Sequence, residues 1–145
     1  MSDDSHLEKL VKMYSLAAVN ALYSPTLRVS PGEAEVRIPI SERFFHSAGA
    51  VHGSVYFKML DDAAFFAAST LEPEFFVLTT SFTTYITRPV SSGHMRSIGR
   101  VVNNTKTQFI VEAIAYDGEE REVARGSGVI VRSKIRLADV AHYST

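Results

Sequence analysis

Two short groups of residues in the middle of the chain could do chemistry, and the first is His52-Gly53-Ser54. These residues come directly before a long apolar run with the composition of a helix. The first turn of a helix exposes free backbone N–H groups at the positive end of the helix dipole. A glycine in that turn lets a ligand approach the backbone closely. The corner could therefore bind an oxyanion, although a helix cap at Ser54 and a simple turn at Gly53 would explain the same residues.

The second group is Asp61-Asp62, two carboxylates inside the same apolar run. An ionised carboxylate among apolar side chains is costly unless it is paired or faces a cavity. Consecutive residues of a helix point about 100° apart, so the two acids cannot share one environment. Lys58 lies one turn before Asp62 and also within reach of Asp61, which makes a local ion cluster one interpretation. In the other interpretation one acid stays under-paired, and burial then raises its pKa and suits it to general-base catalysis.

The helix that carries both groups is expected at residues 54–71 and is apolar around almost its whole circumference. A surface helix has one apolar stripe, so this helix must be wrapped, most simply by a curved sheet. Residues 5–22 have the apolar spacing of a second helix, with Asp4 or Ser5 as its N-cap. Strands are expected at residues 26–30, 33–40, 75–87, 95–103, 107–116 and 122–132.

This order of elements predicts an α+β fold, in which an antiparallel sheet of five to six strands wraps around one central helix. An N-terminal helix lies outside that unit. The chain of 145 residues is expected to form a single domain, with a core at residues 5–132 and a loose polar tail at residues 133–145. The outer face and the edges of such a sheet need cover, so we expect a homo-oligomer, either a dimer or a dimer of dimers.

Composition argues against several classes of function. The chain has 15 basic and 16 acidic residues, a balance that argues against nucleic acid as the main partner. It has no cysteine, which excludes a disulfide framework, a thiol nucleophile and a cysteine-based metal site. The N-terminus has no signal-peptide pattern, and no apolar stretch approaches the length of a membrane span. We therefore expect a cytoplasmic protein that does not bind membranes.

Residues 46–68, HSAGAVHGSVYFKMLDDAAFFAA, resemble the signature of hotdog-fold acyl-CoA thioesterases, in the branch related to the phenylacetate-pathway thioesterase. A strand that ends in Arg-Pro also follows, as TTSFTTYITRPV at residues 79–90, and the order of elements matches over residues 5–132. The pieces that match the signature are Gly49, His52, Gly53 and Asp61, whereas the family's usual Asn is His46 here and its second Gly is Ser54.

The resemblance implies an acyl-CoA thioesterase, which hydrolyses an acyl- or aryl-CoA to a free acid and CoA. Asp61 would be the general base or the nucleophile, and the Gly53 N–H would stabilise the oxyanion. His52 would orient the turn at Gly53 or add a hydrogen-bond donor, and His46 would position the attacking water. Thr79 would supply a hydroxyl near Asp61 from across a dimer interface.

Because CoA carries phosphates, Arg88 and Lys106 are candidates to bind them, although isolated basic side chains on strands are usually solvated. CoA is part of the substrate, so the resemblance implies no cofactor. His6, His94 and His142 have no ligand spacing, and no metal site is expected. Two other functions are compatible with the fold: a non-catalytic acyl-CoA binding module and a hotdog enoyl-CoA hydratase or dehydratase.

Overall fold

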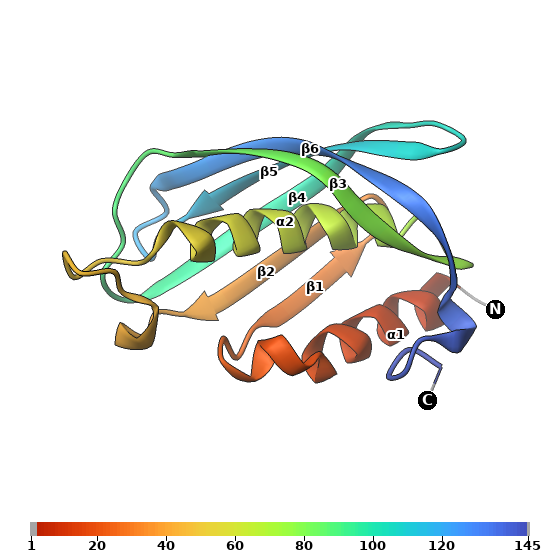
Figure 1. The fold of residues 1–145 in the computed structure, drawn as a ribbon, viewed down its shortest axis with the longest axis horizontal. Helices are drawn as coiled ribbons and strands as arrows, with labels where there is room; N and C mark the ends of the chain where they lie inside the picture. The colour runs from red at the N-terminus through yellow and green to blue at the C-terminus, as the bar shows by residue number, and fades with distance from the viewer. Residues whose placement is uncertain (1–2, 145) are drawn as a thin grey trace.

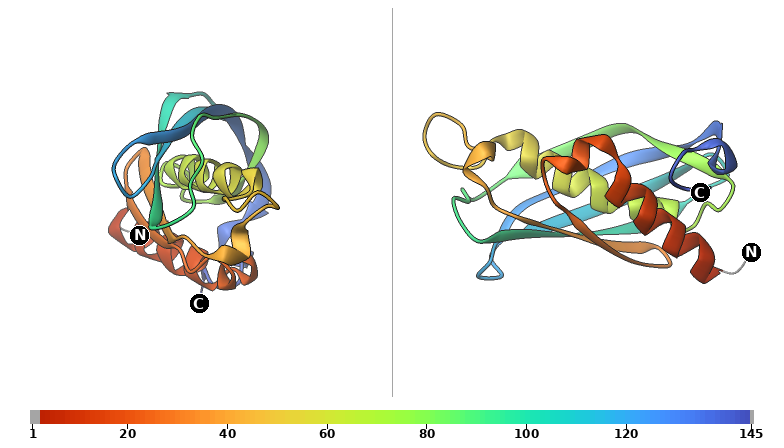
Figure 2. Two further views of the ribbon diagram at one scale, coloured as in Figure 1. Left: turned by 90° about the vertical axis from the view of Figure 1, so that its left-hand side faces the viewer. Right: turned by 90° about the horizontal axis from the view of Figure 1, so that it is seen from below.

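One long helix, α2 (Gly53–Ser69), runs through the middle of the molecule, and a six-stranded antiparallel sheet curves around it in the computed structural model, which describes residues 3–144 (Figure 1). Figure 2 shows α2 nearly end-on inside the curve of the sheet. The strands are β1 (Thr26–Ser30), β2 (Glu33–Pro39), β3 (Phe75–Ile86), β4 (His94–Asn104), β5 (Gln108–Tyr116) and β6 (Glu122–Arg136), in the spatial order β1-β2-β4-β5-β6-β3. The α+β hotdog architecture expected from the sequence is confirmed.

The helix α2 lies unusually close to the sheet because small residues face each other at the contact. Ala63, Ala64, Ala67 and Ala68 are fully buried on the helix. Opposite them is Gly99 of β4, where an added Cβ would lie 2.3 Å from the Ala63 carbonyl carbon. Only glycine permits this backbone-to-backbone approach, which fixes the height of α2 over the sheet and with it the position of the acidic residues.

The N-terminal helix was expected to be continuous, but it is interrupted. Helix α1 (Asp3–Leu16) begins before the expected Asp4 or Ser5 cap and is followed by a separate 3-10 turn, η1 (Ala18–Ala21). Ala17 is extended between them, and the buried Asn20 side chain donates to the Tyr14 carbonyl. In a continuous helix a backbone N–H would donate to that carbonyl at the end of α1. Here the Asn20 side chain donates to it instead, which lets the helix end.

The expectation of a loose tail at residues 133–145 is wrong within the described part. Strand β6 continues to Arg136, which is opposite Phe75 of β3, and a 3-10 turn, η3 (Leu137–Asp139), follows. Leu137 and Tyr143 are both buried. The segment that suggested a tail is therefore the end of a strand followed by a short turn, and its Ser133 hydroxyl donates to the Phe76 carbonyl of β3.

The segment before α2 contains a short 3-10 turn, η2 (Glu42–Phe44), and is otherwise irregular, as expected. The isolated bridge between Phe45 and Val51 closes this segment on itself. The Val51 N–H donates to the Val90 carbonyl at 2.9 Å and ties the segment to the chain after β3. Among residues 3–144, none of the helices has the length and apolar character needed to cross a bilayer.

Candidate functional site

Asp61 is held by a hydroxyl from the neighbouring edge strand. The Thr79 Oγ1 donates to Asp61 Oδ1 at 2.7 Å. The register of β3 against β6 shifts between Thr79 and Ser81, so a bulge directly follows Thr79. A bulge bends the strand and re-aims the side chains beside it. The expected contact between Thr79 and Asp61 is present, but both residues belong to the same chain, so the prediction that the hydroxyl comes from across an interface is wrong.

The surroundings of Asp61 favour its protonated form. Burial raises the pKa of the Asp61 carboxyl above its ordinary value, and the nearby charge of Asp62 raises it further. The hydrogen bond from Thr79 and the positive charge of Lys58 act in the opposite direction without cancelling the effect of burial. A carboxyl with a raised pKa is a stronger base once ionised, which suits it to proton abstraction.

Aromatic rings flank Asp61 on both sides along the helix. Phe57 and Phe65 lie one turn before and one turn after it, and each ring meets a ring of β3. Phe57 packs edge-on against Phe82, with ring centres 5.9 Å apart, and Phe65 packs against Phe76 at 5.4 Å. The carboxyl therefore lies between two aromatic pairs, and the pair at Phe57 stays open to solvent, since Phe57 is 41% exposed.

Asp62 has entirely different partners from Asp61. Its Oδ2 accepts from Lys58 Nζ at 2.7 Å and from the Tyr14 hydroxyl of α1 at 2.6 Å. The expected pairing of Asp62 with Lys58 is confirmed. Tyr14 was not identified from the sequence, because its hydroxyl comes from another helix and its position in α1 resembles that of any apolar residue.

The start of α2 is capped by His52 rather than by Ser54. The His52 Nδ1 accepts from the Ser54 N–H at 3.0 Å and lies 2.8 Å from the Ser54 hydroxyl. The suggested cap at Ser54 is therefore wrong. Among residues 3–144, the Gly53 N–H has no hydrogen-bond acceptor, and the nearest side-chain atom to an added Cβ there would be Ile86 Cδ1 at 3.3 Å. This N–H is available to a ligand.

An open groove of about 360 Å³ lies beside the start of α2. Three of the candidate residues, His46, Gly53 and Arg88, line it together. The Tyr56 hydroxyl donates to the Arg88 carbonyl at 2.9 Å and fixes that part of the wall. His46 accepts from the Ala48 N–H at 3.0 Å through its Nδ1, so the other ring nitrogen is left to face solvent or a ligand.

The remaining candidates do not line this groove. Asp61 lies further along α2, because eight residues of helix separate it from Gly53 by about 12 Å, and Thr79 lies beside Asp61 on β3. Lys106 is exposed in the turn between β4 and β5, at the opposite end of the sheet from the start of α2 (Figure 1). Arg88 and Lys106 of one chain therefore do not line the same groove.

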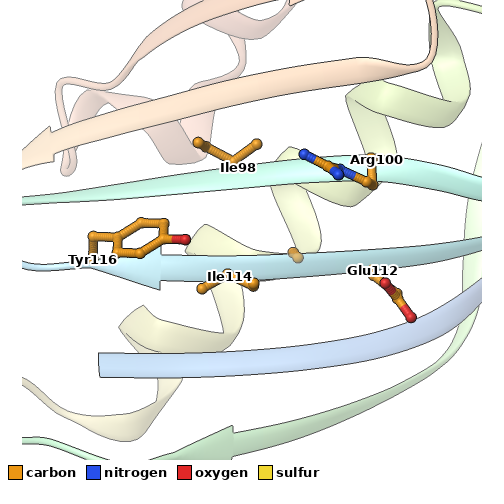
Figure 3. Close-up of a pocket in the computed structure, with 6 residues that line it drawn as sticks. Ile98, Arg100, Glu112, Ile114 and Tyr116 are labelled. Atoms are coloured by element: carbon orange, nitrogen blue, oxygen red, sulfur yellow. The ribbon is translucent and has the colours of Figure 1, made fainter. Parts of the chain in front are cut away.

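A second hollow lies on the outer face of the sheet, away from every candidate residue. It has a volume of about 140 Å³ and is lined from β4 and β5. Figure 3 shows Arg100 and Glu112 on adjacent strands at one side of it, with Ile98, Ile114 and Tyr116 at the other. Within the part of the chain that the structure describes, no three His, Asp or Glu side chains gather closely enough to hold a metal ion.

Comparison with known proteins gives one family. The family model described as "Thioesterase superfamily" matches residues 48–124. A curated relative from Thermoplasma volcanium, named "Putative esterase TV1331", is 27% identical over 101 residues, which cover 70% of this chain and 76% of that protein.

Solved structures share the fold. The PaaI protein of the E. coli phenylacetic acid degradation operon has a TM-score of 0.84 at 16% identity, over 92% of this chain and 97% of that one. A thioesterase family protein from Silicibacter pomeroyi has a TM-score of 0.82 at 24% identity, over 87% and 96%. At these identities the two structures show a shared fold.

Proposed function

The chain belongs to the thioesterase superfamily, and we propose that it hydrolyses an acyl-CoA thioester to a free acid and CoA. The observation that carries this proposal is the Asp61 carboxyl, which has a raised pKa and is held at 2.7 Å by the Thr79 hydroxyl. The chain has no cysteine, which excludes a thiol nucleophile, and the Asp61 carboxylate or water that it activates is the proposed attacking group.

In the proposed reaction, Asp61 removes a proton from water and the resulting hydroxide attacks the thioester carbonyl carbon. The tetrahedral intermediate carries a negative oxygen, which the free Gly53 N–H stabilises at the positive end of α2. Collapse expels the CoA thiolate, which takes up the proton, and leaves the free acid. The variant route, in which the carboxylate itself attacks and forms an anhydride, is distinguished by a single turnover in H₂¹⁸O: only that route places the label in Asp61.

Gly53 and Asp61 cannot act on the same carbonyl within one chain, because about 12 Å of helix lies between them. We propose that a second copy completes the site. Within residues 3–144, strand β3 is an edge strand that pairs with β6 alone, and Leu78, Tyr85 and Ile86 are exposed along it. Unpaired strand edges with apolar side chains favour pairing with another strand. Two β3 strands that pair antiparallel would bring Gly53 of one copy towards Asp61 of the other.

The groove beside Gly53 suits the CoA portion of the substrate. Arg88 offers its guanidinium to a phosphate, and Tyr56 holds the backbone of that residue. His46 faces the same groove and is proposed to position the water or the carbonyl, as a histidine in place of the family's usual asparagine. His52 caps α2 and keeps the Gly53 N–H aimed outward.

The direct test is an assay of the purified protein against a panel of acyl- and aryl-CoAs, beside Asp61→Asn and Asp61→Ala. The matched control is Glu112→Gln, which makes the same chemical change at an exposed residue on the outer face. We expect hydrolysis by the wild type and by the control, and loss of hydrolysis in both Asp61 variants. Tight acyl-CoA binding without turnover would favour the binding module, and hydration of an enoyl-CoA would favour the hydratase.

A further inference from the structure

The Lys58 ammonium has two carboxylates within reach on its own helix and pairs with only one of them. Asp61 is three residues further along and Asp62 four, and both spacings allow contact on a helix. Lys58 Nζ lies 2.7 Å from Asp62 Oδ2, and among residues 3–144 it forms no ion pair with Asp61. Both side chains of this pair are largely buried, at 14% and 17% exposure, so the packing around them fixes the pairing of Lys58 with Asp62.

Two tyrosines from outside α2 hold the ammonium in that place. Its nitrogen lies 5.0 Å from the ring centre of Tyr23 and 5.6 Å from that of Tyr14, distances at which an aromatic face attracts a cation. The Tyr14 hydroxyl also donates to the same Asp62 oxygen that binds Lys58. Burial, and then the charge of Asp62, raise the pKa of Tyr14, so this hydroxyl keeps its proton and remains a donor.

These tyrosines are themselves fixed by packing. Tyr14 meets Phe66 edge-on at 4.9 Å between ring centres, and Tyr23 meets Phe44 at 5.1 Å. The Lys58 ammonium is therefore in contact with Tyr14 of α1, with Tyr23 of the segment after η1 and with Asp62 of its own helix. On the other side of α2, Asp61 receives only the neutral Thr79 hydroxyl.

We infer that Asp62, Tyr14 and Tyr23 are positioning residues that hold the Lys58 ammonium away from Asp61, so that the Asp61 carboxylate stays free to act on water. This inference rests on the proposed function. If Lys58 bound Asp61 instead, the ammonium would occupy the oxygen that must reach water and would make the carboxylate a weaker base. The two charges that act on Asp61 in the described part of the chain are those of Asp62 and Lys58, and Thr79 is the neutral group facing it from β3.

A suppressor experiment tests this inference. Asp62→Asn removes the partner of Lys58, and we expect kcat/KM to fall about tenfold because the ammonium turns to Asp61. Adding Lys58→Met to Asp62→Asn removes the misplaced charge and should restore most of the lost rate. Rates are compared per folded molecule. If Asp62 merely stabilised the fold, the folded Asp62→Asn protein would keep the wild-type rate, and that result, or a folded double variant as slow as the single variant, would overturn the inference.

A ¹³C NMR titration of the Asp61 carboxyl provides a readout that does not depend on catalysis. We expect Asp62→Asn to lower the pKa of Asp61, and to lower it much less in the Lys58→Met background. Equal changes in the two backgrounds would contradict the inference. A protein that hydrolyses no acyl-CoA but shows the expected titrations would refute the proposed function alone, so the two failures are distinguishable. Asp62→Glu should keep the wild-type titration, because it retains the partner of Lys58.

Discussion

Asp61 and Asp62 are adjacent residues of one helix, yet they have opposite environments. Asp62 points towards α1 and accepts from an ammonium and a phenol, whereas Asp61 points towards β3 and accepts from a single aliphatic hydroxyl. Burial raises the pKa of Asp61. The two carboxylates differ because different side chains reach them from other elements. Their places in the sequence are nearly the same, so these contacts decide which acid is structural and which is reactive.

The largest expected effect separates the two acids by activity. Asp61→Asn should lower kcat/KM at least a hundredfold, because it removes the base or nucleophile while keeping the shape of the side chain. Its free energy of unfolding should change by less than about 1 kcal/mol, since no charged partner is left unpaired. Steady-state kinetics and urea denaturation of the same preparation check both statements, and comparable activity in wild type and variant would remove Asp61 from the mechanism.

The next effect separates them by stability. Asp62→Asn should lower the free energy of unfolding by about 2 kcal/mol, because it breaks the ion pair of the largely buried Lys58 ammonium and a turn towards Asp61 replaces that pair only in part. Asp62→Asn with Lys58→Met should recover much of that loss, since neither asparagine nor methionine carries a charge to desolvate. Urea midpoints of the wild type and the two variants measure this. A single variant as stable as wild type would show that the ion pair contributes nothing.

A smaller effect concerns the hydroxyl on Asp61. The Thr79 hydrogen bond lowers the pKa of Asp61 against the effect of burial, so Thr79→Val should raise that pKa. The acidic limb of the kcat/KM profile, which reports ionisation of the free enzyme's base, should then move to higher pH. Thr79→Ser keeps a hydroxyl and should keep the wild-type profile. An unchanged limb in the valine variant would mean that the limb belongs to another group.

The smallest effect is a pH dependence of stability. The folded pKa of Asp61 is raised above its unfolded value, so the folded state binds this proton more tightly than the unfolded state does. The contribution of Asp61 to stability is therefore present below the unfolded pKa and is lost as pH rises through the folded pKa. The free energy of unfolding is measured for wild type and Asp61→Asn across that range. As pH rises, the wild type should lose stability relative to the variant.

Local spacing was enough to predict part of this arrangement. The pairing of Lys58 with Asp62 follows from four residues of helix, and the wrapped central helix follows from an apolar circumference. The approach of Thr79 to Asp61 was expected only through a resemblance, and the resemblance assigned it to the wrong chain. Sequence spacing describes contacts within an element well and contacts between elements poorly.

Other features could not be read from the sequence for the same reason. His52 rather than Ser54 caps α2, because either side chain can accept the same kind of hydrogen bond and backbone geometry decides between them. Tyr14 and Tyr23 meet Lys58 only after α1 has docked. The groove that joins His46, Gly53 and Arg88 depends on loops whose path no periodicity describes.

The buried histidine of α1 has a consequence for the order in which the molecule folds. His6 Nε2 donates to the Ser69 carbonyl at 2.7 Å, and its Nδ1 lies 2.7 Å from the Tyr143 hydroxyl, 137 residues away in sequence. Closing a loop of that length costs more conformational entropy than a local contact does. During synthesis α1 leaves the ribosome first, whereas Tyr143 is made near the end. The hydrogen bond that joins the first helix to the last residues can therefore form only after residue 143 has been added, although α1 also contacts α2 through Ser69 and Asp62.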